Sequence, residues 1–467
     1  MKKTVLSLTL MLCSGAFSGA QPYVPQEGQI PFEIWQTSGT REKHQVLSTP
    51  FSPHAYSRFK CIDLDAAQPS HPFEGLGVSM TDASCWLISR MEPAARKAFL
   101  KDAFGPEGMG ISLIRLNCGA SDYATELYNY DDTPGDTEMK HFSIDRDRLY
   151  MIPVLKEALA ARPDMYVFSS IWSVPGWMKT SGQMCGGSLK DEYLPAFANY
   201  WAAYLKAYKA AGVPVDAITV QNEPLTDQGG GCPACFVSQN QEAKLASVYL
   251  PRAFKKAGLK TDIWIFDHNY KYYQRVLDQL SDPEVRKSVG GVAWHPYSGE
   301  ASQMRAVFEK YPEIPMHLTE RGPNKKHDQP VHWWADVVFG ALNNGCRSYS
   351  SWNLLLDEDG QPVTGRFYCA GLEEVDSVTG KIFQSTQSLL FRQIGPYVQR
   401  GAQILKTEQP DGDVRMIAFR NPDGRHVLVF SALASSDRQK IQIKLNGQYL
   451  CLSLPLNTWS VTTVVIG

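Results

Sequence analysis

Eight short runs of apolar and β-branched residues alternate with longer helix-like stretches between residues 73 and 395, and this alternation constrains the fold more than any other feature. The runs cover residues 73–82, 111–118, 166–173, 217–224, 263–269, 289–297, 316–322 and 347–356. Strands that alternate with helices form a parallel sheet, because each helix returns the chain to the same edge. Eight such units close into a (β/α)8 barrel. The sequence therefore predicts an α/β fold built around a TIM barrel.

The stretches between the runs carry apolar residues at three- and four-residue spacing, which predicts helices. The clearest are residues 93–104, 147–161, 192–211, 240–257 and 331–344. Gly212 and Gly258 follow two of them, at positions that suit helix C-terminal caps. The helices expected after Tyr270 and after Ser302 are shorter.

The texture of the sequence changes after Pro396, where short strands alternate with turns such as Asn446-Gly447. The predicted strands are residues 403–409, 414–420, 426–433, 440–445, 449–454 and 460–466. This pattern is typical of an antiparallel sheet. Residues 30–70 also look extended and could add strands to it. A chain of 467 residues has room for one large barrel and one small domain.

The first residues have the three zones of a secretory signal: Lys2-Lys3, an apolar run over residues 5–12, and the small residues Ser18, Gly19 and Ala20. We expect cleavage after Ala20 and export to the periplasm, the medium or the cell surface. The alternative is lipid attachment at Cys13, which the bulky Leu12 before it disfavours. No later segment has 18 consecutive apolar residues, so no membrane-spanning helix is expected.

Charge and cysteine content exclude several classes of function. The formal net charge is −2, with 46 basic and 48 acidic residues, so neither nucleic acid nor an anionic membrane is an expected partner. Nine of the ten cysteines remain after cleavage, and an odd number leaves at least one free or paired between chains. Cys232 and Cys235 lack the second ligand pair of a zinc site, which leaves a local disulfide or simple packing. The sequence does not define the oligomeric state.

Two of the predicted strands run into glutamates, Glu223 and Glu320. In a barrel of this kind the active site lies at the C-terminal ends of the strands. Two carboxyl groups there suit cleavage of a glycosidic bond, in which one protonates the leaving oxygen and the other attacks or stabilises an oxocarbenium-like centre. This chemistry requires no metal and no cofactor. The same strand ends and their loops also supply Asp82, Arg115, Asp122, Trp172, Trp177, Asn222, His268, His295, Tyr297, Trp352 and Asn353.

Each candidate also has a purely structural interpretation. A single glutamate at a strand end is more often a solvated charge, but two on the fourth and seventh runs favour catalysis. Arg115 inside an apolar strand is costly unless it is paired, so we expect it to support an acid. The tryptophans are either core residues or sugar platforms, with Trp172 and Trp352 better placed than Trp177. For His268 and His295, a structural role as hydrogen-bonded polar residues is as good an interpretation as a role in ligand binding. The cysteines Cys118, Cys346 and Cys369 are expected only to pack.

Seven segments, in this order along the chain, resemble glycoside hydrolase family 30. They are residues 75–83, 114–115 with 121–123, 130–134, 177–180, 187–190, 220–224 and 351–353. This family includes lysosomal-type glucosylceramidases and microbial endo-β-1,6-glucanases. The resemblance extends from about residue 73 to the C-terminus. It implies a catalytic barrel at 73–396 and a β-sandwich built from residues 21–72 and 397–467, after the signal peptide expected at 1–20.

The resemblance also implies the mechanism and the site. Hydrolysis would proceed by double displacement with retention, with Glu223 as acid/base and Glu320 as nucleophile. The residues expected to contact substrate are Asp122, Trp172, Asn222, Tyr297 and Trp352, and those expected to support the site are Arg115 and His295.

The two glutamates need different environments. Glu320 has to be ionised, which Arg115 would favour, whereas Glu223 has to hold a proton. We expect burial against Trp172 or Tyr297 to raise the pKa of Glu223. In a retaining enzyme the two carboxyl groups should lie roughly 5–5.5 Å apart.

Departures from the family pattern bear on the substrate. Ser351 stands where glucosylceramidases often have an acid, and Pro296 separates His295 from Tyr297. Both weaken a ceramide assignment, and the loop at 226–236 is expected to shape the leaving-group side. The prediction is a secreted, retaining endo-β-1,6-glucanase acting on a β-linked glucan or glucoside. The alternatives are a glucosylceramidase-type β-glucosidase, a β-xylanase or β-fucosidase, and a carbohydrate-binding barrel without catalysis.

Overall fold

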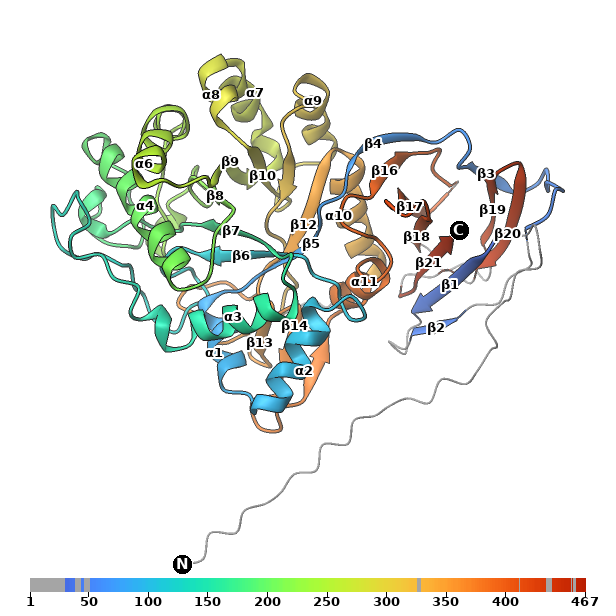
Figure 1. The fold of residues 1–467 in the computed structure, drawn as a ribbon, viewed down its shortest axis with the longest axis horizontal. Coiled ribbons are helices and arrows are strands. Elements are labelled where there is room, and N and C mark those ends of the chain that lie inside the picture. Colours follow the sequence, from blue (N-terminus) through green and yellow to red (C-terminus); the bar gives the residue numbers. More distant parts are fainter. Residues whose placement is uncertain are drawn as a thin grey trace, which may run out of the picture.

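The eight predicted strands form a closed barrel in a computed structural model of the chain (Figure 1). The structure describes residues 30–37, 43–45, 51–325, 329–410, 412–433, 439–454, 456 and 459–467; the expected signal peptide and Cys13 lie outside them. The strands pair in parallel around the ring in the order β10-β11-β12-β5-β6-β7-β8-β9. Their bounds are β5 Gly75–Ser79, β6 Leu113–Asn117, β7 Tyr166–Ser170, β8 Ala217–Thr219, β9 Asp262–Asn269, β10 Gly291–His295, β11 Met316–Leu318 and β12 Cys346–Ser351. The predicted barrel is confirmed.

Several strands end earlier than predicted, because the polar residues at their tails belong to loops. Strand β8 stops at Thr219 and β11 at Leu318, so both Glu223 and Glu320 lie just beyond regular structure. Glu223 has a φ of 45°, outside the extended region that regular strands adopt. The two glutamates are therefore placed by the loops at the barrel mouth.

The helices pack around the barrel in the expected places (Figure 1). Their bounds are α1 Asp82–Ser89, α2 Pro93–Phe104, α3 Met151–Ala161, α4 Leu194–Ala210, α5 Gln239–Lys244, α6 Leu250–Ala257, α7 Tyr273–Ser281, α8 Pro283–Ser288, α9 Ser302–Lys310, α10 Val331–Asn343 and α11 Thr386–Ile394. The helix predicted at 240–257 is interrupted by a π-helical turn, Leu245–Tyr249, just before Pro251. Proline has no N–H for the regular ladder, and a wider turn accommodates that loss. Gly258 ends α6 in the left-handed conformation, with φ 67°.

The second unit consists of two sheets that share one apolar core. A seven-stranded sheet has the order β2-β1-β21-β18-β17-β16-β4, and a three-stranded sheet has the order β20-β19-β3. The bounds are β1 Phe32–Thr37, β2 Lys43–Gln45, β3 Lys60–Asp63, β4 Gln68–Pro72, β16 Gln403–Lys406, β17 Val414–Arg420, β18 His426–Ala432, β19 Gln439–Leu445, β20 Gln448–Leu454 and β21 Val461–Ile466. Ile34, Ile62, Leu428 and Ile443 are among the buried residues between the sheets. Both ends of the described chain thus build the sandwich, as expected, although β3 pairs in parallel with β19.

Helices α10 and α11 lie between the barrel and the seven-stranded sheet (Figure 1). The hydroxyl of Thr463 on β21 donates to the backbone carbonyl of Gln393 on α11 at 2.6 Å, and Arg415 on β17 pairs with Asp336 on α10 at 2.8 Å. A further small sheet follows β12 and was not predicted: β13 Leu355–Asp357, β14 Glu373–Val375 and β15 Ile382–Gln384. Across the described residues, no helix is both long enough and apolar enough to cross a membrane.

Candidate active site

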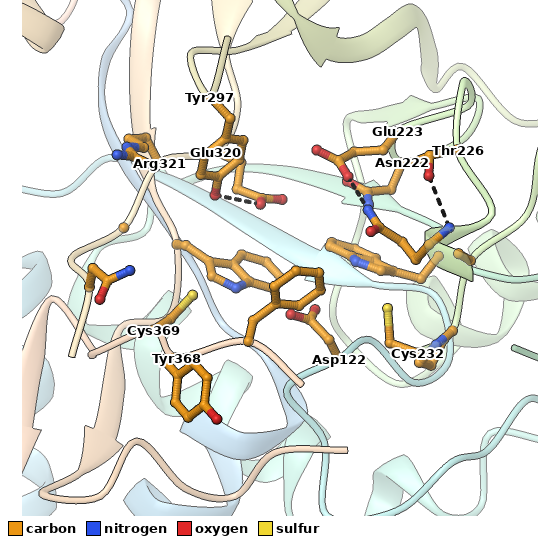
Figure 2. Close-up of a pocket in the computed structure, with 18 of the residues that line it drawn as sticks. Asp122, Asn222, Glu223, Thr226, Cys232, Tyr297, Glu320, Arg321, Tyr368 and Cys369 are labelled. Atoms are coloured by element: carbon orange, nitrogen blue, oxygen red, sulfur yellow. Dashed lines mark hydrogen bonds between the residues drawn. The ribbon is translucent and has the colours of Figure 1, made fainter. Parts of the chain in front are cut away.

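A cavity of about 370 Å³ opens at the C-terminal mouth of the barrel. It brings together seven of the residues singled out from the sequence: Asp122, Trp172, Asn222, Glu223, Tyr297, Glu320 and Trp352. In Figure 2, Glu320 and Glu223 enter from one side of the cavity and Asp122 from the opposite side. Acids, an amide and large rings thus converge on one space, which is the composition that a sugar-binding site needs.

Glu320 is held by two donors. Arg115 donates from Nη1 to Oε2 at 2.5 Å. The hydroxyl of Tyr297 donates to Oε1 at 2.8 Å (Figure 2). Burial and the charge of Glu320 raise the pKa of Tyr297 well above its usual value, so its phenol stays a donor. Both contacts stabilise the negative charge of the Glu320 carboxylate. Tyr297 therefore supports Glu320.

Arg115 is completely buried and has four polar partners. Besides Glu320 they are Asp267 at 2.7 Å, Asn222 at 2.8 Å and Ser170 at 2.9 Å. The guanidinium also lies 4.7 Å from the ring centroid of Trp172. Because every partner is fixed by the barrel, this one side chain sets the relative positions of the groups around it.

Asp267 is the central residue that the sequence analysis missed. It lies on β9 with a φ of 50°, is fully buried, and accepts hydrogen bonds from the five side chains of Arg115, Ser170, Thr219, His295 and Thr319. Burial opposes ionisation, but the charges of Arg115 and His295 and these hydrogen bonds hold the pKa of Asp267 well below its usual value. The signal in the sequence is an aspartate that ends the apolar run at 263–266.

His295 connects the acids. Its Nε2 lies 2.9 Å from Asp267 and 3.9 Å from Glu320, and its Nδ1 lies 3.2 Å from Glu223. Burial acts to lower the pKa of His295, but the charges of Glu320 and Asp267 outweigh it and raise the pKa to about 10. The imidazole is therefore a cation at neutral pH.

The charge on His295 overturns the expected protonation of Glu223. Burial alone would raise the pKa of this carboxyl, but the hydrogen bond and charge of His295, with a contribution from His268, lower it below the usual value. Trp172 stacks on Trp352, with ring centroids 5.1 Å apart. In the substrate-free protein the shared proton thus resides on His295.

The other oxygen of Glu223 is occupied by the loop that follows β8. Gln228 donates from Nε2 to Oε2 of Glu223 at 2.6 Å, and its own backbone N–H donates to the hydroxyl of Thr226 at 2.9 Å (Figure 2). A substrate oxygen that approaches this carboxyl has to displace the Gln228 amide or share its place.

Replacing Gln228 by alanine should raise the pKa of Glu223, because a hydrogen bond to the charged form favours that form. A hydrogen bond to a charged group is worth about 1.5–3 kcal/mol, which corresponds to a shift of about 1–2 pH units. The titration of the Glu223 carboxyl, followed by ¹³C NMR, should move upward by that amount, while Gln183→Ala, in an exposed neighbouring loop, should leave it in place. An unmoved titration in the Gln228 variant would contradict this assignment.

Asp122 lies on a loop that is held in place by the backbone of residues 364–365. Its backbone carbonyl accepts from the N–H groups of Thr364 at 2.7 Å and Gly365 at 3.0 Å. A Cβ at Gly365 would lie 2.7 Å from the Cβ of Asp122, so only glycine permits this approach. Burial, and next the charge of Glu320, raise the pKa of Asp122 well above its usual value. In its neutral form, which the raised pKa favours, this carboxyl can both donate to and accept from a ligand hydroxyl.

Other candidates lie outside the cavity. The indole N–H of Trp177 donates to the carbonyl of Asp131 at 3.0 Å, and Asp82 pairs with Arg146 at 2.6 Å. His268 lies behind Glu223, 3.6 Å from its Oε1. Asn353 accepts from Thr81 at 2.9 Å.

Loops that carry no periodic pattern supply cavity residues the sequence analysis did not find, including Arg321, Asn324, Phe367 and Tyr368. Cys369, expected only to pack, also lines the cavity, as does Cys232. Cys232 and Cys235 are free thiols, which leaves packing of the two earlier interpretations.

Stability should depend on pH through His295. Its folded pKa of about 10 lies above the ordinary value of 6.5, so its contribution is complete below about pH 6.5 and is lost as the pH rises through 10. The free energy of unfolding in urea should therefore fall between pH 7 and pH 10. His295→Gln should flatten this slope, and an equal slope in the variant would contradict the assignment.

Comparison with known proteins identifies related sequences over both units. Residues 73–382 match the Glycosyl hydrolase family 30 TIM-barrel domain, and residues 401–464 match the Glycosyl hydrolase family 30 beta sandwich domain. An endo-1,6-beta-D-glucanase of Neurospora crassa is 29% identical over 422 residues, 85% of each chain. The lysosomal acid glucosylceramidase of Mus musculus is 26% identical over 404 residues, 79% of this chain and 77% of its own. A solved structure of an endo-beta1,6-glucanase superposes with a TM-score of 0.83 at 26% identity, covering 93% of this chain and 99% of the other.

Proposed function

Because the chain belongs to glycoside hydrolase family 30, and so is a glycoside hydrolase, we propose that it cleaves internal bonds of β-1,6-linked glucan with retention of configuration. The observation that carries the proposal is the pairing of two carboxyl groups in one cavity. Glu320 is stabilised as an anion by Arg115 and Tyr297, while Glu223 shares a proton with His295.

In the proposed reaction, Glu320 attacks the anomeric carbon and Glu223 protonates the departing glycosidic oxygen. A covalent glycosyl-enzyme forms, and Glu223 then removes a proton from the water that releases the sugar. The two carboxyl groups should lie at the separation of a retaining pair, roughly 5–5.5 Å. No step calls for a cofactor.

His295 is the proposed source of the proton that Glu223 has to deliver. It holds this proton 3.2 Å from Oε1 of Glu223. When the leaving-group oxygen displaces the amide of Gln228, Glu223 loses a donor that favours its charged form. Substrate entry thereby raises the proton affinity of Glu223, and the proton moves from His295 to the carboxyl that uses it.

The remaining cavity residues are proposed to hold the sugar. Trp352 and Trp172 offer aromatic faces for its C–H surface. The side-chain oxygen of Asn222 accepts from Arg115, which leaves the side-chain NH₂ group of Asn222 to donate to the ligand. The expected acceptor is the 2-hydroxyl of the sugar. Asp122, on the opposite wall, completes the set of polar groups, and its raised pKa favours the neutral form that can donate.

Two observations support an internal site of attack on a polymer. A second cavity of about 270 Å³ shares Pro323 and Asn324 with the first, so the binding surface continues beyond one sugar. The relative from Neurospora crassa and the superposed structure are both named as endo-acting on β-1,6 linkages. Export, proposed from residues 2–20, would place the enzyme where such polymers occur.

The test is a proton NMR time course on linear β-1,6-glucan that follows product size and the first anomer released. We expect β-configured oligosaccharides to appear first. α-Anomers first would refute retention, and glucose alone would refute internal cleavage. Glucosylceramide and β-xylan, measured in parallel, serve as control substrates; faster turnover of either would refute the proposed glucan.

A further inference from the structure

Three metal-ligand side chains converge on the side of Glu223 that faces β9 and β10. Among the described residues, Glu223, His268 and His295 are the one set of three side chains placed closely enough to hold a metal ion together. One ligand atom of each lies within 4.8 Å of those of the other two. Oε1 of Glu223 lies 3.2 Å from Nδ1 of His295 and 3.6 Å from Nδ1 of His268.

His268 has a nitrogen without a hydrogen bond. Its Nδ1 is buried and has no hydrogen-bond partner among the described residues, although it lies 3.6 Å from Oε1 of Glu223; the side chain is 6% exposed. The proposed hydrolysis makes no use of this nitrogen.

We propose that Glu223, His268 and His295 bind a borderline divalent ion such as Zn²⁺, and that the bound ion inhibits hydrolysis. Two histidines and a glutamate are a donor set that zinc commonly accepts, with bonds of about 2.0–2.2 Å. Tetrahedral bonds of that length separate neighbouring ligand atoms by about 3.3 Å. The two distances from Glu223 are already close to this value, and the fourth position stays open to water.

The surroundings of His295 suit a metal ligand. Its other nitrogen, Nε2, lies 2.9 Å from Asp267, and a carboxylate in that place orients a zinc-binding histidine. The incoming ion takes the position of the proton between His295 and Glu223, which leaves to solvent. His295 keeps its hydrogen bond to Asp267, so the core of the barrel mouth stays intact.

Inhibition, unlike binding, rests on the proposed role of Glu223. An ion on Oε1 keeps Glu223 from carrying the proton that the leaving group needs. It also blocks the transfer of that proton from His295 to Glu223. The ion is therefore an inhibitor and no part of the reaction, which agrees with chemistry that needs no metal. The three ligands come from three strand ends, so no short sequence motif reveals them.

The test is calorimetric titration of tag-free, metal-stripped protein with Zn²⁺, with the visible absorption of Co²⁺ as a second probe. We expect one ion per chain, and at least about tenfold weaker binding in His268→Gln. His141→Gln, which removes an exposed histidine on a distant loop, is the matched control and should bind as the parent does. Circular dichroism checks that each variant is folded.

Failure of binding and failure of the proposed function give different results. Absent binding, or equal binding in His268→Gln, would overturn the metal site and leave the hydrolase mechanism untouched. Stoichiometric binding with full hydrolysis would overturn inhibition and the role of Glu223 together. If His268→Gln does not fold, zinc-soaked crystals of the parent decide, because an anomalous peak has to lie between the three ligands.

Discussion

Glu320→Gln is expected to reduce hydrolysis of β-1,6-glucan by at least about 10⁴-fold, the scale seen when a nucleophile is removed. Glutamine keeps the shape and can still accept from Arg115 and Tyr297, but its amide cannot form the glycosyl-enzyme. The measurement is kcat on the polymer for purified variants. Glu300→Gln, which changes an exposed acid after β10, is the control and should retain activity. Activity of Glu320→Gln near that of the parent would remove Glu320 from its proposed role.

A second experiment separates the two glutamates. With an activated aryl β-glucoside and added azide, Glu320→Ala should yield the α-glucosyl azide, because the anion attacks from the side that Glu320 vacates. Glu223→Ala should yield the β-glucosyl azide, because its glycosyl-enzyme still forms and azide replaces water. The opposite products would exchange the two assignments.

Arg115→Met is expected to destabilise the protein by about 3–5 kcal/mol and to abolish hydrolysis. The substitution leaves the buried carboxylates of Asp267 and Glu320 with His295 as the cation they share, and removing one partner of a buried pair costs this much. Urea unfolding at neutral pH measures it. Arg425→Met breaks a pair whose side chains are 42% and 38% exposed, and should cost less than about 1 kcal/mol.

The double variant Arg115→Met, Asp267→Asn tests the cause. If the loss comes from an unpaired charge at Asp267, neutralising that charge should recover part of it, and the two changes should not be additive. Strict additivity would show that Arg115 stabilises the barrel by packing against Trp172 and Trp352 instead. Arg115→Lys keeps the charge but cannot reach four partners, so the stability of this variant should lie between those of the parent and Arg115→Met.

The barrel could be predicted because its signals are local. A buried strand appears in the sequence as a short apolar run, and a helix as apolar residues spaced three and four apart. Both patterns can be recognised without knowing which other elements pack against the segment. Glu223 and Glu320 were found for the same reason, since each follows such a run directly. The strand ends were less accurate, because the polar residues that follow each apolar run were counted as strand although they belong to loops.

The protonation of the site could not be predicted, because it depends on contacts between distant strands. Asp267 precedes His268, which was considered, yet only the closed barrel shows that five donors meet at this aspartate. The charge of His295 follows from Asp267 and Glu320, and the lowered pKa of Glu223 follows from His295. Phe367 and Tyr368 were missed for a different reason: their loop has no period, and its position is set by β13 and β14.

The pairing of β1 with β21 determines when the sandwich can form during synthesis. Phe32–Thr37 pairs along its full length with Val461–Ile466, so the first described strand cannot make these hydrogen bonds until the last strand has been made (Figure 1). Closing such a long loop gains no contact until residue 466 has been translated, whereas each βα unit can form as it emerges. Until then the edge of β1 that faces β21 stays open, and β2 pairs with the other edge. The sandwich is therefore completed only after the whole barrel has been translated.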